Sequence, residues 1–202
     1  MPIYLDDQPV QLSGVDLASV LDSAADHLRA SWRIVVEVTL DGEPLVDEQL
    51  ESRRHDAVAD GELRLYSANP RDLSRTTLEA VLGRLDAVAQ RQREAADLIS
   101  SDQQNEAMTA LTQAIEGWQQ SQQVVIQTAS LTATDLSTLD IDGASAQEVI
   151  EQVITMLQVV RDTIEARDMI GLADTLAYEG PALIKQWQKL VTALIERIDE
   201  SK

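Results

Sequence analysis

An acidic loop in the second half of the chain has the residue types of a calcium site. Its run TLDIDGASAQEV sets Gly143 at the sixth position of a twelve-residue calcium-binding loop. The first, third and fifth positions are then Thr138, Asp140 and Asp142, and the twelfth is Val149. Such a loop needs carboxylates at its first and last positions, where this run has a threonine and a valine. We therefore interpret it as a connection that leads into a helix, and we expect no metal site.

Side chains that carry enzyme chemistry are scarce in the rest of the sequence. The chain has no cysteine, which excludes disulfides, thiol catalysis and thiolate metal ligands. Its two histidines are His27, near the end of a predicted helix, and His55, in a polar loop, and they lack metal-ligand spacing. The sequence contains no Ser-His-Asp set, glycine-rich phosphate loop or zinc-protease motif. We predict that the protein is not an enzyme and has no catalytic residue and no cofactor.

The run LADTLAYEGPALIKQW, residues 172–187, is the most unusual stretch of predicted helix. Pro181 has no amide hydrogen, so the carbonyl of Ala177 loses its helical partner and a kink is expected there. The kink either bends the helix around its neighbours or forms a notch with a polar rim that binds a partner. For the second interpretation, the candidate partner-binding residues are Tyr178, Glu179, Pro181 and Trp187. The segment LADTLAYE is similar to a signature of uncharacterised bacterial proteins, which implies no function.

Long amphipathic helices must position these residues, because apolar side chains recur at spacings of three and four from residue 70 onwards. Asn69 and Pro70 suit a helix start, since asparagine can cap and proline fits the first helical position. Helices are expected from Pro70 to about Ile99, from a cap at Ser101 to about Leu131, from a cap at Ser145 to about Ile164, and from about Met169 to Glu200. Short connections favour antiparallel neighbours, so residues 70–202 are predicted to form a four-helix bundle of two helical hairpins.

Capping signals support two of these helix starts. Ser101 with Gln104, and Ser145 with Glu148, have the spacing of capping boxes. The two hairpins also share an Asp-to-Ala spacing, but their Asp-to-Trp spacings differ, so the sequence leaves open whether they are a repeat. The apolar faces of the helices can pack against one another within one chain or between two chains. The sequence therefore also leaves open whether the protein is a homo-oligomer.

Residues 1–69 have the pattern of a small α+β module. Residues 3–12 read as two short strands joined by a turn, and a helix capped by Asp16 follows. The next strand alternates, with Ile34, Val36, Val38 and Leu40 expected on one face. It ends at a turn formed by Asp41 and Gly42, and a last strand is centred on Leu63 and Leu65.

This order of strands and helix resembles the β-grasp fold of ubiquitin. The residues that match the pattern of that family are Leu40, Gly42, Leu45, Asp47, Leu50, Leu63 and Leu65. The resemblance covers about a third of the chain, and it implies one helix lying across a mixed sheet. The predicted class is therefore α+β, with a β-grasp-like module at residues 1–69 and a helical bundle at residues 70–202.

The sequence departs from ubiquitin-type modifiers at the end of this module. Modifiers of that family end in a flexible tail with two glycines, whereas here Tyr66 to Pro70 lead directly into a helix. Conjugation is therefore not expected. The resemblance implies that a fused module of this kind binds a partner through its sheet face or an edge strand. The alternative is that it only packs against the helices.

Acidic side chains dominate both parts of the chain. The formal net charge is −19, and no Lys or Arg occurs between Arg93 and Arg161. Phosphate backbones and anionic membranes would be repelled, so neither nucleic acid nor membrane is an expected partner. The charge serves solubility or steers a basic partner. With no signal peptide or membrane-spanning run and no cysteine, a cytoplasmic location is expected.

Two modules without a catalytic constellation suggest an adaptor that binds proteins. We predict a non-enzymatic protein–protein interaction function. The alternative is a secretion- or flagellar-type chaperone that shields an export substrate with its helical bundle. A third class is a small-molecule sensor or enzyme that uses the region from Tyr178 to Trp187.

Overall fold

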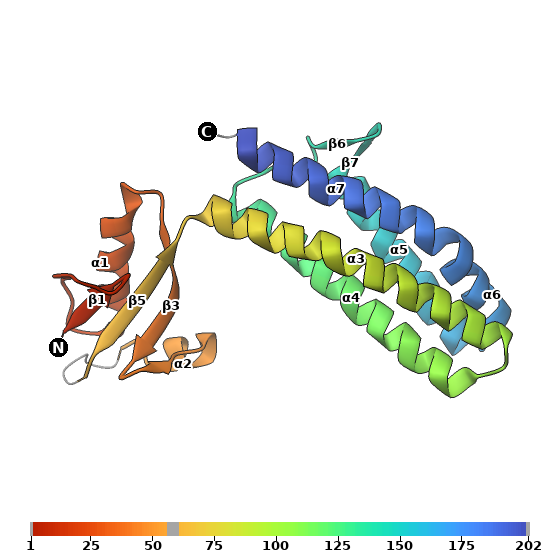
Figure 1. Cartoon of the computed structure of the whole chain (residues 1–202), viewed down its shortest axis with the longest axis horizontal. Helices are drawn as coiled ribbons and strands as arrows, with labels where there is room; N and C mark the ends of the chain where they lie inside the picture. Colours follow the sequence, from red (N-terminus) through yellow and green to blue (C-terminus); the bar gives the residue numbers. More distant parts are fainter. Residues whose placement is uncertain (1, 56–60, 201–202) are drawn as a thin grey trace. The chain divides into compact units, whose positions relative to one another are not determined.

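The computed structural model describes residues 2–55 and 61–200, and it divides the chain into two compact units, Met1–Leu73 and Ser74–Lys202. The first contains a small mixed sheet and the second is helical (Figure 1). This confirms the predicted α+β class. The boundary lies inside the first turn of helix α3 (Pro70–Ser100), a few residues beyond the end expected from the sequence.

The sheet of the first unit has the strand order β2-β1-β5-β3-β4. Strands β1 and β5 are parallel, and all other neighbours are antiparallel. Its strands, within the described residues, are β1 (Ile3–Leu5), β2 (Gln8–Pro9), β3 (Ile34–Leu40), β4 (Glu43–Pro44) and β5 (Leu63–Ala68). The short helix α2 (Asp47–Ser52) lies between β4 and β5 in the chain. Strand β5, whose Leu63 and Leu65 are fully buried, is therefore central in the sheet.

Two-residue turns close both hairpins of this sheet. Asp6 and Asp7 join β1 to β2 with φ angles of 49° and 62°, and Asp41 and Gly42 join β3 to β4 with 53° and 82°. Positive φ at both positions is the conformation that matches the right-handed twist of the flanking strands. Aspartate and glycine tolerate it better than most residues. The turn predicted at Asp41 and Gly42 is confirmed.

Helix α1 (Leu17–Arg29) covers one face of the sheet. Its start is confirmed at Asp16, where Oδ1 accepts a hydrogen bond from the Ser19 amide at 2.9 Å. The core between helix and sheet consists of Leu5, Leu17, Val20, Ala24, Leu28, Val38, Leu63 and Leu65. Each large aliphatic side chain in it contributes about 1.5 to 3 kcal/mol of hydrophobic free energy. These residues hold the unit together.

The expected alternation of β3 is wrong at Val36. The pairing with β5 shifts between Val35 and Glu37, which makes Val36 the extra residue of a β-bulge, and its side chain is 46% exposed. A bulge reverses the in-out alternation of the residues on its two sides. Val35 and Val38 therefore pack toward the core, and Val36 does not share their face.

The second unit consists of two antiparallel helical hairpins (Figure 1). Helix α3 is followed by α4 (Gln104–Leu131), and α5 (Ala146–Glu165) is followed by α6 (Met169–Asp174), a π-helical segment η1 (Thr175–Glu179) and α7 (Gly180–Glu200). The last three are continuous and correspond to the predicted fourth helix. A hairpin of β6 (Asp140–Ile141) and β7 (Ala144–Ser145) precedes α5. This hairpin lies in the stretch for which the sequence predicts only a connection leading into a helix.

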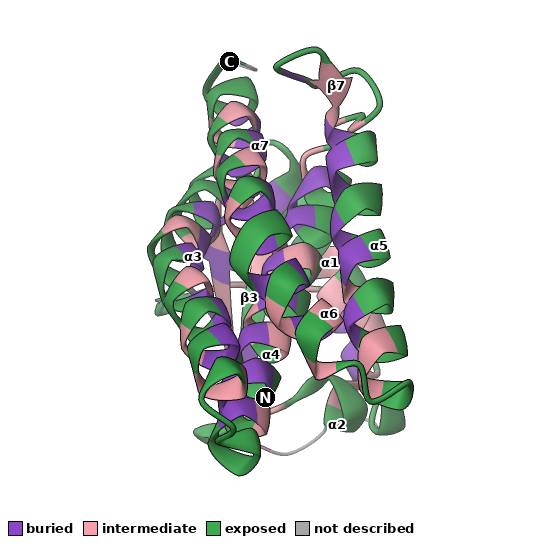
Figure 2. Ribbon diagram, turned by 90° about the vertical axis from the view of Figure 1, so that its right-hand side faces the viewer, coloured by how far each residue is buried: buried purple, intermediate pink, exposed green. Residues whose placement is uncertain are grey.

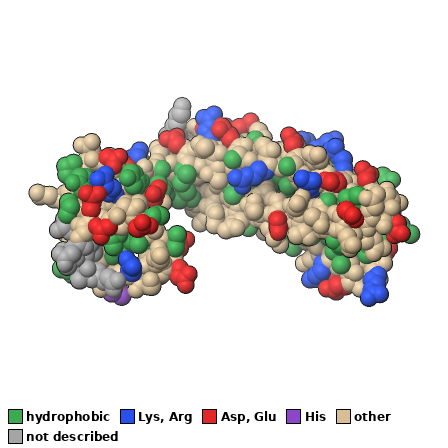
Figure 3. All heavy atoms as spheres, turned by 60° about the horizontal axis from the view of Figure 1, so that its bottom comes forward, with side chains coloured by type: hydrophobic (Ala, Val, Ile, Leu, Met, Phe, Trp, Pro, Cys, Tyr) green, Lys and Arg blue, Asp and Glu red, His purple; other side chains and the backbone are tan. Residues whose placement is uncertain are grey.

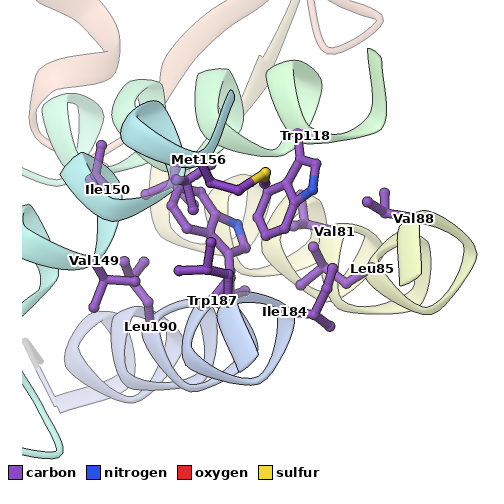
Figure 4. Packing of buried hydrophobic residues seen from close by; sticks show 14 of the residues in the cluster. Val81, Leu85, Val88, Trp118, Val149, Ile150, Met156, Ile184, Trp187 and Leu190 are labelled. Carbon is purple, nitrogen blue, oxygen red and sulfur yellow. The ribbon is translucent and has the colours of Figure 1, made fainter. Parts of the chain in front are cut away.

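The core of the bundle is built around two tryptophans, Trp118 of α4 and Trp187 of α7 (Figure 4). Their rings meet edge to face, with centroids 5.7 Å apart and an interplanar angle of 83°. The indole Nε1 of Trp187 donates a hydrogen bond to Oγ of Ser121 at 2.6 Å. Buried residues lie on the sides of α3, α4, α5 and α7 that face one another (Figure 2). The chain has no phenylalanine, and these two indoles are the largest of its fully buried side chains within the described residues.

One of the two predicted capping boxes is present. Ser145 and Glu148 exchange the expected bonds at the start of α5. The box predicted from Ser101 and Gln104 is wrong, because the Ser101 hydroxyl donates to the carbonyl of Asp97 in α3. The chain then turns at Asp102, whose φ is 59°, and α4 begins without a side-chain cap.

Glycines 83 and 117 lie inside α3 and α4 and differ in what an added methyl group would meet. A Cβ at Gly117 falls 2.5 Å from Cγ2 of the buried Val88, whereas a Cβ at Gly83 meets nothing within 4 Å. Gly83→Ala is expected to raise the free energy of unfolding by about 0.5 to 1 kcal/mol, because alanine favours helix. Gly117→Ala is expected to lower it, because overpacking costs about 1 to 3 kcal/mol. Urea denaturation followed by circular dichroism measures both, and equal stabilisation would contradict the close contact.

Candidate functional site

The predicted kink at Pro181 is a π-helical turn. The amide of Gly180 donates to the carbonyl of Thr175, five residues earlier, at the end of η1. A π-helical turn accommodates one more residue than an α-helical turn, and such turns occur frequently at functional sites. Pro181 follows directly and donates no amide hydrogen. The chain changes direction between α6 and α7 at this point (Figure 1).

The structure separates the four candidate partner-binding residues. Tyr178 and Glu179 are exposed, Tyr178 to 77%, and Pro181 is half-buried. Trp187 is fully buried in the core of the bundle, where it contacts Trp118, so it is withdrawn from the surface. This corrects the grouping of Trp187 with the other three. Trp187 belongs to the row of buried apolar residues along α7, and it lies about two helical turns beyond Tyr178 and Glu179.

A groove begins at Glu179 and runs between α5 and the start of α7. Its volume is about 740 Å³. Spacings of three and four residues give each helix one lining face. From α5 the lining residues are Glu148, Glu151, Gln152, Thr155, Met156 and Val159, and from η1 and α7 they are Glu179, Ala182, Leu183 and Gln186. Gly143 and Ala144 of the hairpin close one end. We call this site the α5–α7 groove.

The α5–α7 groove has an apolar floor and an acidic rim. Met156 and Leu183 are buried beneath it, and Val159 is 36% exposed within it. Glu148, Glu151 and Glu179 line its sides, and the lining contains no Lys or Arg. An exposed aliphatic floor with polar groups around it is the usual composition of a site for another molecule. The groove therefore combines hydrophobic contact with negative charge.

The three glutamates differ in what already holds them. The Glu148 carboxylate accepts from the amide and the hydroxyl of Ser145 at 2.6 and 3.0 Å, which lowers its pKa. Glu151 accepts from the side-chain amide of Gln147 at 3.1 Å. The Glu179 carboxylate makes no hydrogen bond or ion pair with the described residues of the chain. Glu148 is thus committed to the helix cap, while Glu151 and Glu179 are the groups available to a ligand.

The β6–β7 hairpin lies in residues 138–149, the run with the residue types of a calcium-binding loop. Asp142 and Gly143 form its turn with φ angles of 56° and 89°. Asp140 Oδ1 accepts from the Gly143 amide at 3.2 Å, and Asp142 pairs with Lys189 of α7. Within residues 2–55 and 61–200, no group of three or more His, Cys, Asp or Glu side chains is arranged to hold a metal ion. These carboxylates position the hairpin at the end of the groove.

Of the four candidate partner-binding residues, only Glu179 lines the groove. The sequence did not identify Glu151 and Val159 as site residues. They lie on the flank of α5, beside the buried apolar residues that recur at spacings of three and four. The signal that bears on them is the flank itself, where lining residues recur at spacings of three and four from Glu148 to Val159. Only the position of α7 makes this flank one side of a groove.

Charges of both signs lie on the molecular surface. Lys and Arg side chains occur in small groups between acidic side chains on the face of the helical unit drawn in Figure 3. Of the two histidines, His27 is exposed, and His55 Nδ1 lies 3.7 Å from Asp16 Oδ2 at the start of α1. Neither lies in the groove.

Comparisons with known proteins bear on the helical unit. A family model described as a domain of unknown function (DUF8042) matches residues 76–190, more than half of the chain. The matched range contains the whole lining of the α5–α7 groove. No curated protein and no solved structure gives a significant match. In the described part of the chain, no helix is long and apolar enough to cross a membrane.

Proposed function

The chain belongs to the DUF8042 family, whose domain has no known function, and from this premise we propose that it is a non-enzymatic protein–protein interaction protein. The helical unit takes one segment of a partner protein into the α5–α7 groove. The first unit offers a second surface, which makes the whole an adaptor in the cytoplasm. The observation that carries the proposal is the groove, because it combines an exposed aliphatic floor with an acidic rim that contains no Lys or Arg.

Hydrophobic contact is the main source of affinity in this proposal. Val159 and Ala182 are exposed in the groove, and Met156 and Leu183 lie beneath them. Burying an exposed valine side chain under a partner contributes about 1.5 kcal/mol or more. The polar side chains of Gln152 and Gln186 at the rim offer hydrogen bonds that fix the orientation of the partner.

The first unit supports the adaptor interpretation. Its strand order and single covering helix are those expected for a ubiquitin-like β-grasp module. On the sheet face opposite α1, the Arg64 guanidinium lies 4.7 Å from the centre of the Tyr4 ring and pairs with Asp7 at 2.8 Å. Aromatic and arginine side chains are enriched in protein interfaces. This face is the second binding surface of the proposal.

An export chaperone is the alternative function. The same groove favours it, because a chaperone of that kind needs one long site for one segment of its substrate. The two functions differ in the number of partners. An adaptor holds two partners on separate surfaces, whereas a chaperone holds one partner through the helical unit alone.

Affinity capture with the full-length chain as bait tests the proposal. Val159→Gln/Ala182→Gln removes the exposed apolar groups of the groove. The matched control, Ile126→Gln/Ala87→Gln, likewise replaces one β-branched aliphatic residue and one alanine by glutamine, on exposed positions of α4 and α3 outside the groove. We expect at least one protein that is bound by wild type and by the control but lost from the groove variant, as mass spectrometry of the captured proteins would report.

Other outcomes of this capture have definite meanings. A second partner retained by the groove variant but lost from Tyr4→Ala/Arg64→Ala supports the adaptor. A single groove-dependent partner supports the chaperone. Equal loss from the groove variant and its control would contradict a role for the groove. If no protein is enriched and a metabolite raises the melting temperature, the chain is a small-molecule sensor instead.

A further inference from the structure

We propose that the occupant of the α5–α7 groove is a basic amphipathic helix of the partner protein, about three turns long. This inference rests on the proposed protein-binding function and specifies the chemistry of the segment bound. It follows from three properties of the groove: the sign of its charge, its exposed aliphatic floor, and its length between two antiparallel helices.

The charge of the groove selects a cationic ligand. Glu148, Glu151 and Glu179 line it, and no lining residue is basic. The hydrogen bonds from Ser145 lower the pKa of Glu148 and so favour its ionised form. The cation-free stretch between Arg93 and Arg161 includes all of α4 and every lining residue of α5, and Arg161, farther along α5, pairs with Asp162. Lys or Arg side chains of a partner would provide the missing counter-charges.

The floor of the groove requires that the ligand is also apolar on one side. Val159 and Ala182 are exposed there above Met156 and Leu183. A free metal ion or a polyamine would neutralise the glutamates but leave these aliphatic groups in water. A segment with one apolar face covers the floor and places its basic residues at the two rims. That distribution of side chains is the pattern of an amphipathic helix.

The dimensions of the groove match a helix of about three turns. Its α5 side extends from Glu148 to Val159, eleven residues apart, which corresponds to about 17 Å of helix axis. On the other side, the lining from Gln186 back to Glu179 runs in the opposite direction. A depression between two packed helices accepts the side-chain ridge of a third helix, and helix-in-groove binding is a common mode of recognition. Apolar side chains of the partner helix at spacings of three, four and seven residues would reach the floor of the groove.

The test uses the full-length chain and a synthetic probe. The probe is a fluorescein-labelled peptide of about 15 residues, made of Leu, Ala and Lys, with leucines along one helical face and lysines flanking them. A second peptide has the same composition in scrambled order, and a third has glutamate in place of every lysine. Fluorescence anisotropy measures binding at about 50 mM and about 300 mM salt, because screening weakens contacts between exposed charges.

Two charge-matched variants decide whether the groove is the site. Glu151→Lys/Glu179→Lys reverses the two available carboxylates of the rim. Asp97→Lys/Glu116→Lys reverses two exposed carboxylates on α3 and α4 and changes the net charge equally. All four side chains are exposed, so both variants are expected to fold, and thermal unfolding checks this. Glu151→Gln/Glu179→Gln serves as a second groove variant if the reversal destabilises the chain.

We expect the cationic amphipathic peptide to bind wild type and the Asp97/Glu116 variant within about threefold of each other. The Glu151/Glu179 reversal is expected to weaken binding at least about tenfold, which corresponds to about 1.4 kcal/mol. The scrambled and acidic peptides are expected to bind at least about tenfold more weakly than the first, and higher salt should weaken the first further.

Three outcomes would overturn the inference. These are absence of binding to wild type, equal weakening in both charge variants, and equal affinity for the scrambled peptide. If any of them occurs while Val159→Gln/Ala182→Gln still loses a captured protein, the groove binds a partner of other chemistry and the proposed function stands. If that variant also retains every captured protein, both proposals fail.

Discussion

Replacing Trp187 by alanine is expected to lower the free energy of unfolding of the helical unit by about 3 to 5 kcal/mol. The side chain is fully buried, meets the ring of Trp118 edge to face, and donates a hydrogen bond to Ser121. Its removal leaves a cavity that rigid helices fill only in part, and it leaves the Ser121 hydroxyl buried without that donor. Urea denaturation followed by circular dichroism measures the change.

A matched pair of conservative exchanges separates packing from hydrogen bonding at this site. Trp187→Phe loses the bond to Ser121, whereas Trp118→Phe removes an indole N–H that has no hydrogen-bond partner among the described residues. Both lose a similar volume, so Trp187→Phe is expected to be the more destabilising by about 1 kcal/mol or more. If Trp118→Phe were equally or more destabilising, the contribution assigned to the Ser121 bond would be contradicted.

The second large effect is expected in the first unit, where Leu65→Ala should cost about 2 to 5 kcal/mol. Leu65 is fully buried at the centre of β5, the strand that pairs with both β1 and β3. Its core is distinct from the core around the two tryptophans. The damage is therefore expected to stay within residues 2–73, of which the structure describes all but 56–60.

Hydrogen exchange with mass spectrometry distinguishes the two units in one experiment. In Leu65→Ala, peptides from β3 and β5 are expected to lose protection, whereas peptides from α4 and α7 keep it. Arg29→Ala, an exposed substitution on α1, is the control and should leave protection unchanged in both units. Loss of protection in α4 and α7 together with β5 would show that the two cores unfold as one.

Local signals in the sequence located most elements of the fold. The cap at Asp16, the turn at Asp41 and Gly42, and the box of Ser145 and Glu148 were all identified, because each depends on residues within four positions of one another. The predicted sheet and helical bundle are likewise confirmed as α+β architecture. The spacing of apolar residues and the capping residues of a helix are properties of a single segment. The structure they predict forms when the tertiary contacts favour the same local conformation.

Features that depend on an extra residue or on a distant neighbour escaped prediction. The bulge at Val36 reverses an alternation that looks regular along the strand, and only its pairing with Ser67 and Tyr66 reveals it. The same holds for the groove, since Glu151 and Val159 become its lining only once α7 lies beside α5. Trp187 is a different case. Its place in the apolar period already indicated burial, and that signal should have outweighed its nearness to Pro181.

The π-helical segment of residues 175–179 has a consequence for the evolution of chain length. In a regular helix, a one-residue deletion rotates everything beyond it by about 100°, which would turn core positions toward water. Here the segment holds one residue more than an α-helical turn needs, so a deletion within it leaves Leu172 and Leu183 facing the core. The same deletion within α5 would misalign Val149 with Met156. This segment is thus a position at which the chain can lose one residue while the bundle keeps its core positions.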